Sequence, residues 1–262
     1  MKKRKIMKWP SSITLIRHGE SAYNVLRAKK NADPEYQLFK KEYEKDFQSD
    51  ECRRLAKIIN ERFRLGVSDY ETPLTENGKR QAFETGKKLR LEMKLPDAIM
   101  VSTYLRTRQT LAGLEEGWPE LKKAKREFDE RIIEQEHGLS LLYNDWRVFH
   151  VMNPKQKEYR EMQGPYFYKF PQGESVLNVR RRCHEEVDML IREYSEQNVL
   201  LITHHLTILS IRANQERLSP EQFIYLDKNE KPKNCGITQY VGNPKLGSNG
   251  RLELKLYNKV LY

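Results

Sequence analysis

The sequence predicts an α/β fold: a three-layer sandwich with a mostly parallel central sheet and helices on both of its faces. Short apolar runs of strand length recur along the chain, and amphipathic helical patterns lie between them. Strands that alternate with helices are typical of a parallel sheet covered on both faces. The chain has 262 residues, which is long enough to bury such a core within one domain.

Five segments indicate strands. Four are short apolar runs that suit buried strands, at residues 13–16, 98–101, 199–202 and 237–241. In the fifth, residues 252–257, the leucines at 252, 254 and 256 alternate with Glu, Lys and Tyr. Successive side chains of a strand point to opposite faces, so this alternation predicts an edge strand with one wet face.

Amphipathic patterns predict helices between these strands. Thr75 can cap a helix that runs to about Met93, and a second helix begins near Glu174. A third begins at Ser219, where Pro220 takes the first helical position and Gln222 completes a capping box.

Two stretches indicate insertions into a single domain that spans residues 1–262. Residues 27–70 are rich in Lys, Glu, Asp and Tyr, and we expect them to be helical in pieces. Residues 139–170 hold many aromatic side chains. Neither stretch has the composition of a linker, and either could cover a site.

The composition favours a globular protein with a charged surface. The net charge is 48 − 37 = +11, which favours anionic partners without selecting a nucleic acid, a membrane surface or a phosphorylated metabolite. Three cysteines without CxxC spacing argue against a disulfide framework or a zinc ribbon, and fit a cytoplasmic location. The basic residues 1–5 precede no long apolar run, so we expect no signal peptide, and no window resembles a membrane span.

Polar side chains follow three of the buried strands at the point where each strand ends. Arg17 and His18 follow the first, Ser102 and Arg106 the second, and Thr203 with two histidines the last. Because parallel strands end at the same rim of a sheet, we expect these side chains to converge. Arginine offers a planar fork of donors that matches phosphate oxygens, and a neutral imidazole is nucleophilic at pH 7.

The chain resembles the histidine phosphatase superfamily, also called the phosphoglycerate mutase-like family. The matching segments occur in the family's order over most of the chain: Arg17 to Asn24, Pro73 to Ala82, Ser102 to Thr110, Glu134 to Gly138, Gly173 to Ser175, and Ile202 to His204. The resemblance implies a phosphoglycerate mutase-like fold and a phosphohistidine mechanism that needs neither a metal nor another cofactor.

The resemblance also implies a role for each matching residue. His18 would be the nucleophile, and Arg17, Arg106 and His204 would hold the transferring phosphoryl group. Glu134 would protonate the leaving oxygen and then activate water. Asn24 and Ser175 resemble further substrate contacts. His205 stands where many members have Gly, so it could narrow the pocket, contact the substrate or compete with His204 for the phosphate.

Several titratable residues have a simpler interpretation. We expect His137 and His150 to lie at the surface or partly buried, and His184 to lie on a solvated helix face together with Glu186. Glu136 competes with Glu134 as the acid, although Glu134 has the matching distance to Gly138. Arg108 could form a helix salt bridge or reach an anionic substrate.

Other functions remain as alternatives. A metal hydrolase would use the same histidines, but no HExxH-like spacing occurs and the paired arginines would repel a cation. A nucleic-acid-binding protein would fit the net charge, but basic and acidic residues are interspersed and no recognition motif occurs. The same fold could also serve as a catalytically silent scaffold.

Within the enzyme interpretation we favour a phosphatase that hydrolyses small phosphate monoesters. Glycolytic mutases usually carry a Phe-Thr-Gly-Trp segment soon after the first motif, where this chain has residues 27–70. A phosphoglycerate mutase-type transfer is the alternative. The expected partner is a small anionic phosphate ester, with neither a nucleic acid nor a membrane, and the sequence contains no signal for an oligomeric state.

Overall fold

The computed structural model describes residues 8–262, and these residues group into two compact units. The first unit contains residues 8–21, 73–134 and 178–262, and the second contains residues 22–72 and 135–177. The second unit thus includes both ranges expected as insertions, while the single domain with two insertions stays a prediction. The basic N-terminal segment, where no signal peptide is expected, lies outside the described residues.

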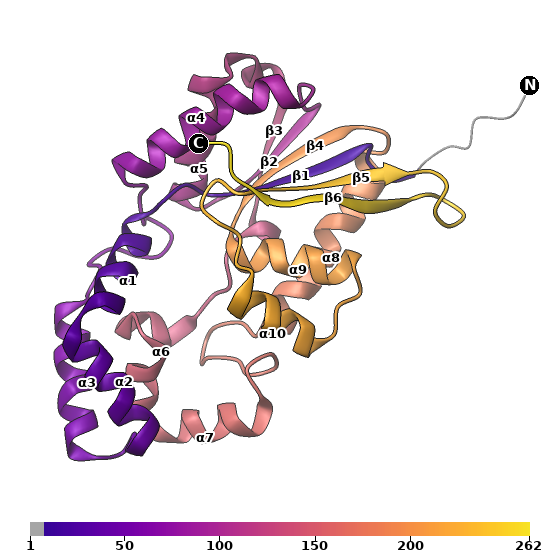
Figure 1. The fold of residues 1–262 in the computed structure, drawn as a ribbon. Coiled ribbons are helices and arrows are strands. Elements are labelled where there is room, and N and C mark those ends of the chain that lie inside the picture. Colours follow the sequence, from indigo (N-terminus) through magenta and orange to yellow (C-terminus); the bar gives the residue numbers. More distant parts are fainter. Residues whose placement is uncertain (1–7) are drawn as a thin grey trace, which may run out of the picture. The chain divides into compact units, whose positions relative to one another are not determined.

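The first unit is built on a mixed sheet, six-stranded in the part of the chain that the structure describes (Figure 1). The strand order is β3-β2-β4-β1-β5-β6, with bounds β1 Ser12–Arg17, β2 Ala98–Ser102, β3 Lys125–Asp129, β4 Asn198–Thr203, β5 Ile237–Asn243 and β6 Arg251–Lys259. Strands β1 to β4 pair in parallel, while β5 and β6 are antiparallel. The predicted strands and the predicted edge position of residues 252–257 are confirmed.

Strand β3 has no signal in the sequence. Its residues are Lys125, Arg126, Glu127, Phe128 and Asp129, and Phe128 is 59% exposed. The strand forms because it lies at the free edge of β2, with Ala98 opposite Lys125 in parallel register. Main-chain hydrogen bonds to a neighbour do not depend on side-chain hydrophobicity, so no apolar alternation is needed.

Helices cover both faces of the sheet, as the three-layer prediction requires (Figure 1). Alternate strand residues divide between two cores, so Ile13 and Leu15 pack with α8 and α9 while Ile16 packs with α4 and α5. The bounds in this unit are α4 Glu76–Glu92, α5 Leu105–Gly117, η1 Pro119–Lys123, η2 Glu130–Ile132, α8 Val176–Glu193, α9 His205–Gln215 and α10 Pro220–Asn229.

Both predicted caps are present. The Thr75 hydroxyl accepts a hydrogen bond from the Gly78 amide, and Ser219 with Gln222 forms the capping box of α10. Among the described residues, no helix combines the length and apolar character needed to cross a bilayer.

The second unit is helical, which confirms the expectation for residues 27–70. Its elements are α1 Ala22–Ala32, α2 Pro34–Asp46, α3 Asp50–Arg62, η3 Gly138–Tyr143, α6 Trp146–Met152 and α7 Pro154–Gln163. Phe39, Leu55 and Val148 belong to its apolar core. Lys30 and Asp145 form a buried ion pair at 2.8 Å, and the Tyr36 hydroxyl donates to the same carboxylate, so no isolated charge is buried there.

Two expectations about titratable residues are wrong. His150 is fully buried in the second unit against Tyr43, Trp146 and Phe149, and burial lowers its pKa to about 4. Glu186 is also fully buried, and burial raises its pKa to about 8. His184 is exposed as expected. The charged run around His184 masked the fact that Glu186 occupies an inward position of α8.

Helices α4 and α5 approach each other closely through glycines. A Cβ atom added at Gly86 would lie 2.3 Å from the Leu114 carbonyl oxygen, and one added at Gly117 would lie 2.2 Å from the Phe83 carbonyl oxygen. Both obstacles are backbone atoms, so neither can yield as a flexible side chain would. This contact keeps α4 and α5 together on one face of the sheet.

Gly86→Ala tests this packing. Alanine would favour an isolated helix by about 1 kcal/mol, but the clash with a backbone oxygen should outweigh that gain. We expect the free energy of unfolding, measured by urea denaturation, to fall by roughly 1–3 kcal/mol. Lys88→Ala, at an exposed position of the same helix, is the control and should stay within about 0.5 kcal/mol. A Gly86→Ala protein as stable as the parent would contradict the close approach.

Candidate active site

Three neighbouring parallel strands end at one rim of the sheet, in the order β2, β4, β1. Arg17 pairs with Thr203 in register, so the residues that follow β1 and β4 emerge side by side. The His18 amide donates to the Thr203 carbonyl at 3.0 Å, and the rings of His18 and His204 lie 5.3 Å apart between centroids. Two histidines that are far apart in the sequence therefore face one another within the first unit.

His18 is 3% exposed, and its tautomer is defined by its main-chain contact. Nδ1 lies 2.8 Å from the Gly19 carbonyl oxygen, which can only accept a hydrogen bond. The proton therefore resides on Nδ1, and the lone pair on Nε2. Burial, followed by the positive charges of Arg106 and Arg17, holds the pKa of His18 well below its ordinary value. The ring is thus neutral, with Nε2 unprotonated.

Gly19 is required by a close backbone approach. A Cβ atom there would lie 2.5 Å from the Gly78 carbonyl oxygen, at the first turn of α4. The Gly19 amide donates to the Thr110 hydroxyl on α5 at 3.0 Å. The carbonyl that orients His18 is therefore itself held between α4 and α5.

His204 is fully buried, and its ring is oriented by Ser102. The Ser102 hydroxyl lies 2.7 Å from Nε2, while no described residue offers a hydrogen-bond partner to Nδ1. If the hydroxyl donates to Nε2, Nδ1 carries the proton and becomes a donor without an acceptor. Burial, followed by the positive charge of Arg106, holds the pKa of His204 well below its ordinary value. A buried donor that lacks a partner is suited to a ligand oxygen.

Two guanidinium groups supply the positive charge of the site. Arg106 is 4% exposed in the first turn of α5, and it lies 4.7 Å over the Tyr104 ring. That ring in turn contacts His204 edge-on at 5.1 Å, so Tyr104 separates and orients the two groups. Arg17 donates to the Pro232 carbonyl at 2.7 Å. Both arginines lower the pKa of both histidines, so their charges act on the space around the two rings.

Glu134 follows η2 and is half-buried. Its Oε1 accepts a hydrogen bond from the Leu206 amide at 3.1 Å, in the first turn of α9. The amide groups at a helix N-terminus favour a carboxylate. The Glu134 carboxylate is therefore held next to Leu206, two residues after His204.

His205 directs its ring to a different neighbour. Its Nε2 lies 2.9 Å from Oδ1 of Asp227 on α10, and Lys231 lies 3.7 Å from the same oxygen. The pair places His205 between α9 and α10. Its bulk, which replaces the usual glycine, is thus accommodated by a carboxylate from another helix.

The other predicted residues belong to the second unit or to helix surfaces. Asn24 is half-buried on α1, and Ser175 is 5% exposed just before α8. Both lie in the second unit. Glu136, the competing acid, is exposed there, and its amide donates to the Glu174 carboxylate. Arg108 lies on α5 in the first unit.

The sequence pattern places Ser102 and Thr203 at strand ends without assigning them a partner, and it does not single out Thr110. Ser102, Thr110 and Thr203 are all fully buried. The Ser102 hydroxyl contacts the His204 ring, and the Thr110 hydroxyl accepts from the Gly19 amide. The Thr203 hydroxyl donates to the Ile132 carbonyl. Their signal was present, since Ser102 and Thr203 end buried strands, but a short polar residue at a strand end is too common to suggest a partner.

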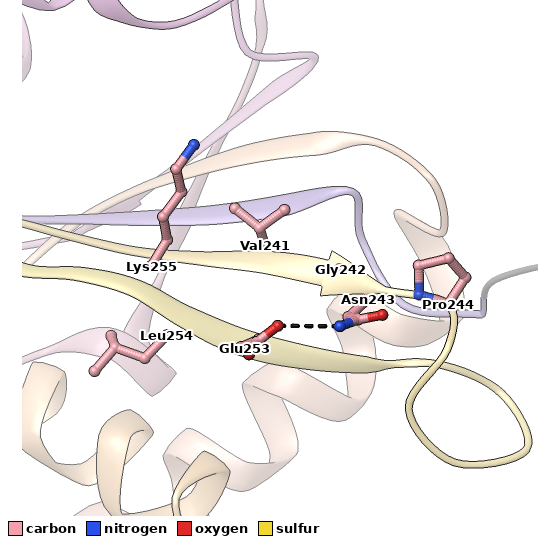
Figure 2. A pocket seen from close by; sticks show the side chains of 7 residues that line it. All are labelled: Val241, Gly242, Asn243, Pro244, Glu253, Leu254 and Lys255. Carbon is pink, nitrogen blue, oxygen red and sulfur yellow. Dashed lines mark hydrogen bonds between the residues drawn. The ribbon is translucent and has the colours of Figure 1, made fainter.

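A depression between β5 and β6 lies away from this site. Figure 2 shows its lining, which includes Val241, Pro244 and Lys255, with a hydrogen bond of 3.0 Å from Asn243 to Glu253. Val241 pairs with Ser12, so the depression lies at the opposite end of β1 from His18. It is a surface feature of the β5–β6 hairpin.

The protonation of His18 can be measured. Its pKa is lowered, so His18 should stay neutral with the proton on Nδ1 as the pH falls through the ordinary histidine range near 6.5. The unfolded chain takes up that proton, and the folded state should therefore lose stability below about pH 6.5. Arg106→Gln removes one cause of the shift and should raise the pKa of His18. Imidazole ¹⁵N chemical shifts report both effects, and protonation of His18 between pH 6 and 7 would contradict the assignment.

Comparison with known proteins identifies a family. Residues 60–248 match the model of the histidine phosphatase superfamily (branch 1); the match begins after β1, so His18 lies outside it. The phosphoglycerate mutase-like protein AT74H of Arabidopsis thaliana is 28% identical over 76% of this chain and 63% of its own. This chain thus spans less than two thirds of the length of the curated relatives it matches.

Solved structures share the fold. A mycobacterial glucosyl-3-phosphoglycerate phosphatase, solved with VO3, aligns over 95% of this chain and 98% of its own with a TM-score of 0.62 and 19% identity. A protein described as a putative α-ribazole-5'-P phosphatase from Escherichia coli aligns over 96% and 98% with a TM-score of 0.64 and 14% identity. The match over residues 60–248 shows that the chain belongs to the histidine phosphatase superfamily, branch 1.

Proposed function

We propose that this protein hydrolyses small phosphate monoesters through a phosphohistidine formed on Nε2 of His18. The observation that carries the proposal is the contact of 2.8 Å between Nδ1 and the Gly19 carbonyl in a buried ring of lowered pKa. It leaves Nε2 unprotonated and nucleophilic at neutral pH.

In the first step, Nε2 of His18 attacks phosphorus and the bond from phosphorus to the ester oxygen breaks. Glu134, protonated in this step, gives its proton to the leaving oxygen. Charge that develops on the equatorial oxygens is offset by Arg17 and Arg106, and Nδ1 of His204 donates to one of them. Ser102 keeps His204 in the tautomer that can do so.

In the second step, water attacks the phosphohistidine. The Glu134 carboxylate accepts a proton from that water, and the bond between phosphorus and Nε2 breaks. Inorganic phosphate leaves, and His18 returns to its neutral form. The chain itself supplies the nucleophile, the proton donor and the positive charge, so the proposed mechanism requires no metal or organic cofactor.

The partner in this proposal is a small anionic phosphate ester. The basic net charge of +11 and the paired arginines support it. Asn24, Ser175 and His205 are proposed as contacts to the part of the ester beyond the phosphate, on the strength of their place in the motifs. The three cysteines are buried and form no disulfide in the part of the chain that the structure describes, which supports a cytoplasmic location.

Hydrolysis is favoured over mutase-type transfer because two similar folds are described as phosphatases. The name of AT74H, phosphoglycerate mutase-like, keeps the transfer to a second hydroxyl as the other candidate. The two activities share the phosphohistidine and differ only in the acceptor, water or an alcohol.

His18→Ala tests the nucleophile. Phosphate release from a panel of phosphate esters, with and without 2,3-bisphosphoglycerate, should fall by at least about 10⁴-fold because the covalent step is lost. Interconversion of phosphoglycerates that depends on the bisphosphate would assign the mutase instead. Activity that survives in His18→Ala but is abolished by a chelator would refute the phosphohistidine, and an inactive parent would favour a silent scaffold.

Glu134→Gln tests the acid. The variant cannot protonate the leaving oxygen, so kcat/KM for an alkyl phosphate should fall by roughly 10²–10⁴-fold. For p-nitrophenyl phosphate, whose leaving group needs little protonation, the loss should be below about tenfold. Glu136→Gln is the control for the competing acid and should leave this selectivity unchanged. Equal losses on both esters in Glu134→Gln would contradict the assignment.

A further inference from the structure

We propose that Arg182 is a positioning residue for Glu134, because it clamps the backbone segment that carries the acid. The inference rests on the proposed function of Glu134. Arg182 lies on α8, outside the strand-end motifs, and its positive charge also contributes to the lowered pKa of His204.

The segment 131–134 is held through its carbonyl oxygens. Arg182 donates from Nη1 to the carbonyls of Arg131 at 2.8 Å and Ile133 at 2.9 Å, and from Nη2 to that of Glu134 at 3.0 Å. The Thr203 hydroxyl donates to the Ile132 carbonyl at 2.6 Å. Four consecutive carbonyl oxygens thus accept hydrogen bonds from side chains of α8 and β4.

This arrangement compensates for a lack of regular structure. Beyond η2 the chain is neither helix nor strand, so no ladder of main-chain bonds determines its path. Buried carbonyl groups need donors, and a guanidinium offers several in a rigid plane. One arginine can therefore orient three peptide groups at once, which a lysine cannot do with the same geometry.

Helix α9 also contacts this segment. The Thr207 hydroxyl donates to the Ile133 carbonyl at 2.5 Å, and the Leu206 amide donates to the Glu134 carboxylate at 3.1 Å. Thr203 also links the acid to the nucleophile, since its carbonyl accepts from the His18 amide while its hydroxyl holds Ile132. The separation of acid and nucleophile is thus determined by β4, α8 and α9 together.

A second contact from α8 supports this function of the helix. Glu186, one turn beyond Arg182, lies 3.1 Å from the Arg131 guanidinium, at the start of the clamped segment. Arg131 also pairs with Asp129 at the end of β3. Two side chains on one face of α8 therefore contact the segment that runs from β3 to Glu134. A shift of this segment would displace the acid.

The test is a comparison of two esters in variants of the full chain. Arg182→Met should lower kcat/KM for an alkyl phosphate by about 10–100-fold, because a small displacement of a catalytic group is costly. It should lower kcat/KM for p-nitrophenyl phosphate by less than about threefold, since that ester needs little acid catalysis. Arg181→Met, at the exposed neighbouring position, is the matched control and should leave both values within about twofold.

A double variant distinguishes positioning from a general structural effect. In the Glu134→Gln background, Arg182→Met should cost less than about threefold more on the alkyl ester, because there is no acid left to misplace. Equal losses on both esters, or the full additional loss in this background, would overturn the inference. If Arg182→Met does not fold by circular dichroism, Thr207→Val carries the same comparison, with a selective loss expected and an equal loss contradicting the clamp.

Failure of the proposed function has a different signature. An active His18→Ala or an unselective Glu134→Gln would overturn the proposed mechanism and this inference with it. A selective Glu134→Gln combined with an unselective Arg182→Met would overturn the clamp alone.

Discussion

The parallel pairing of β1 with β4 is the constraint on which the site depends. Because Arg17 lies opposite Thr203, the next residue of each strand enters the same space, and His18 meets His204. The main-chain bond from the His18 amide to Thr203 extends this register one residue beyond the strand pair. A slip of one residue would turn the side chains to opposite faces of the sheet and separate the two rings.

Burial and positive charge act together on these rings. Desolvation and the two nearby guanidinium groups both disfavour protonation, so the histidines stay neutral. Burial of the Arg106 guanidinium costs stability, since desolvation of a charged group is unfavourable. In the proposed function this cost would be offset when a phosphate binds, because a dianion would attract both guanidinium groups and meet donors that are already oriented.

Glu134 is positioned in a different way. It lies in an irregular segment, and side chains of α8, α9 and β4 donate hydrogen bonds to consecutive carbonyl groups of that segment. The proposed nucleophile is thus held by the sheet, and the proposed acid by hydrogen bonds from side chains. Both connect to Thr203, whose carbonyl accepts from the His18 amide and whose hydroxyl donates to the Ile132 carbonyl, two residues before Glu134. His18 and the segment before Glu134 therefore share one residue as a common point of attachment.

The sequence by itself determined the layers, most of the strands and the identity of the groups at the strand ends. Apolar runs and helical periodicity report burial directly, and Arg17, His18, Arg106 and His204 stand at run ends that a parallel sheet brings together. Only the tertiary structure decided how those groups are oriented. Strand β3 exists through pairing with β2, Glu186 points inward from a charged run, and His150 is buried against partners that include Tyr43, which is distant in the sequence. Local sequence patterns do not encode contacts between elements. The structure was therefore needed to find the tautomer of His18, the partner of His205 and the hydrogen bonds of Arg182.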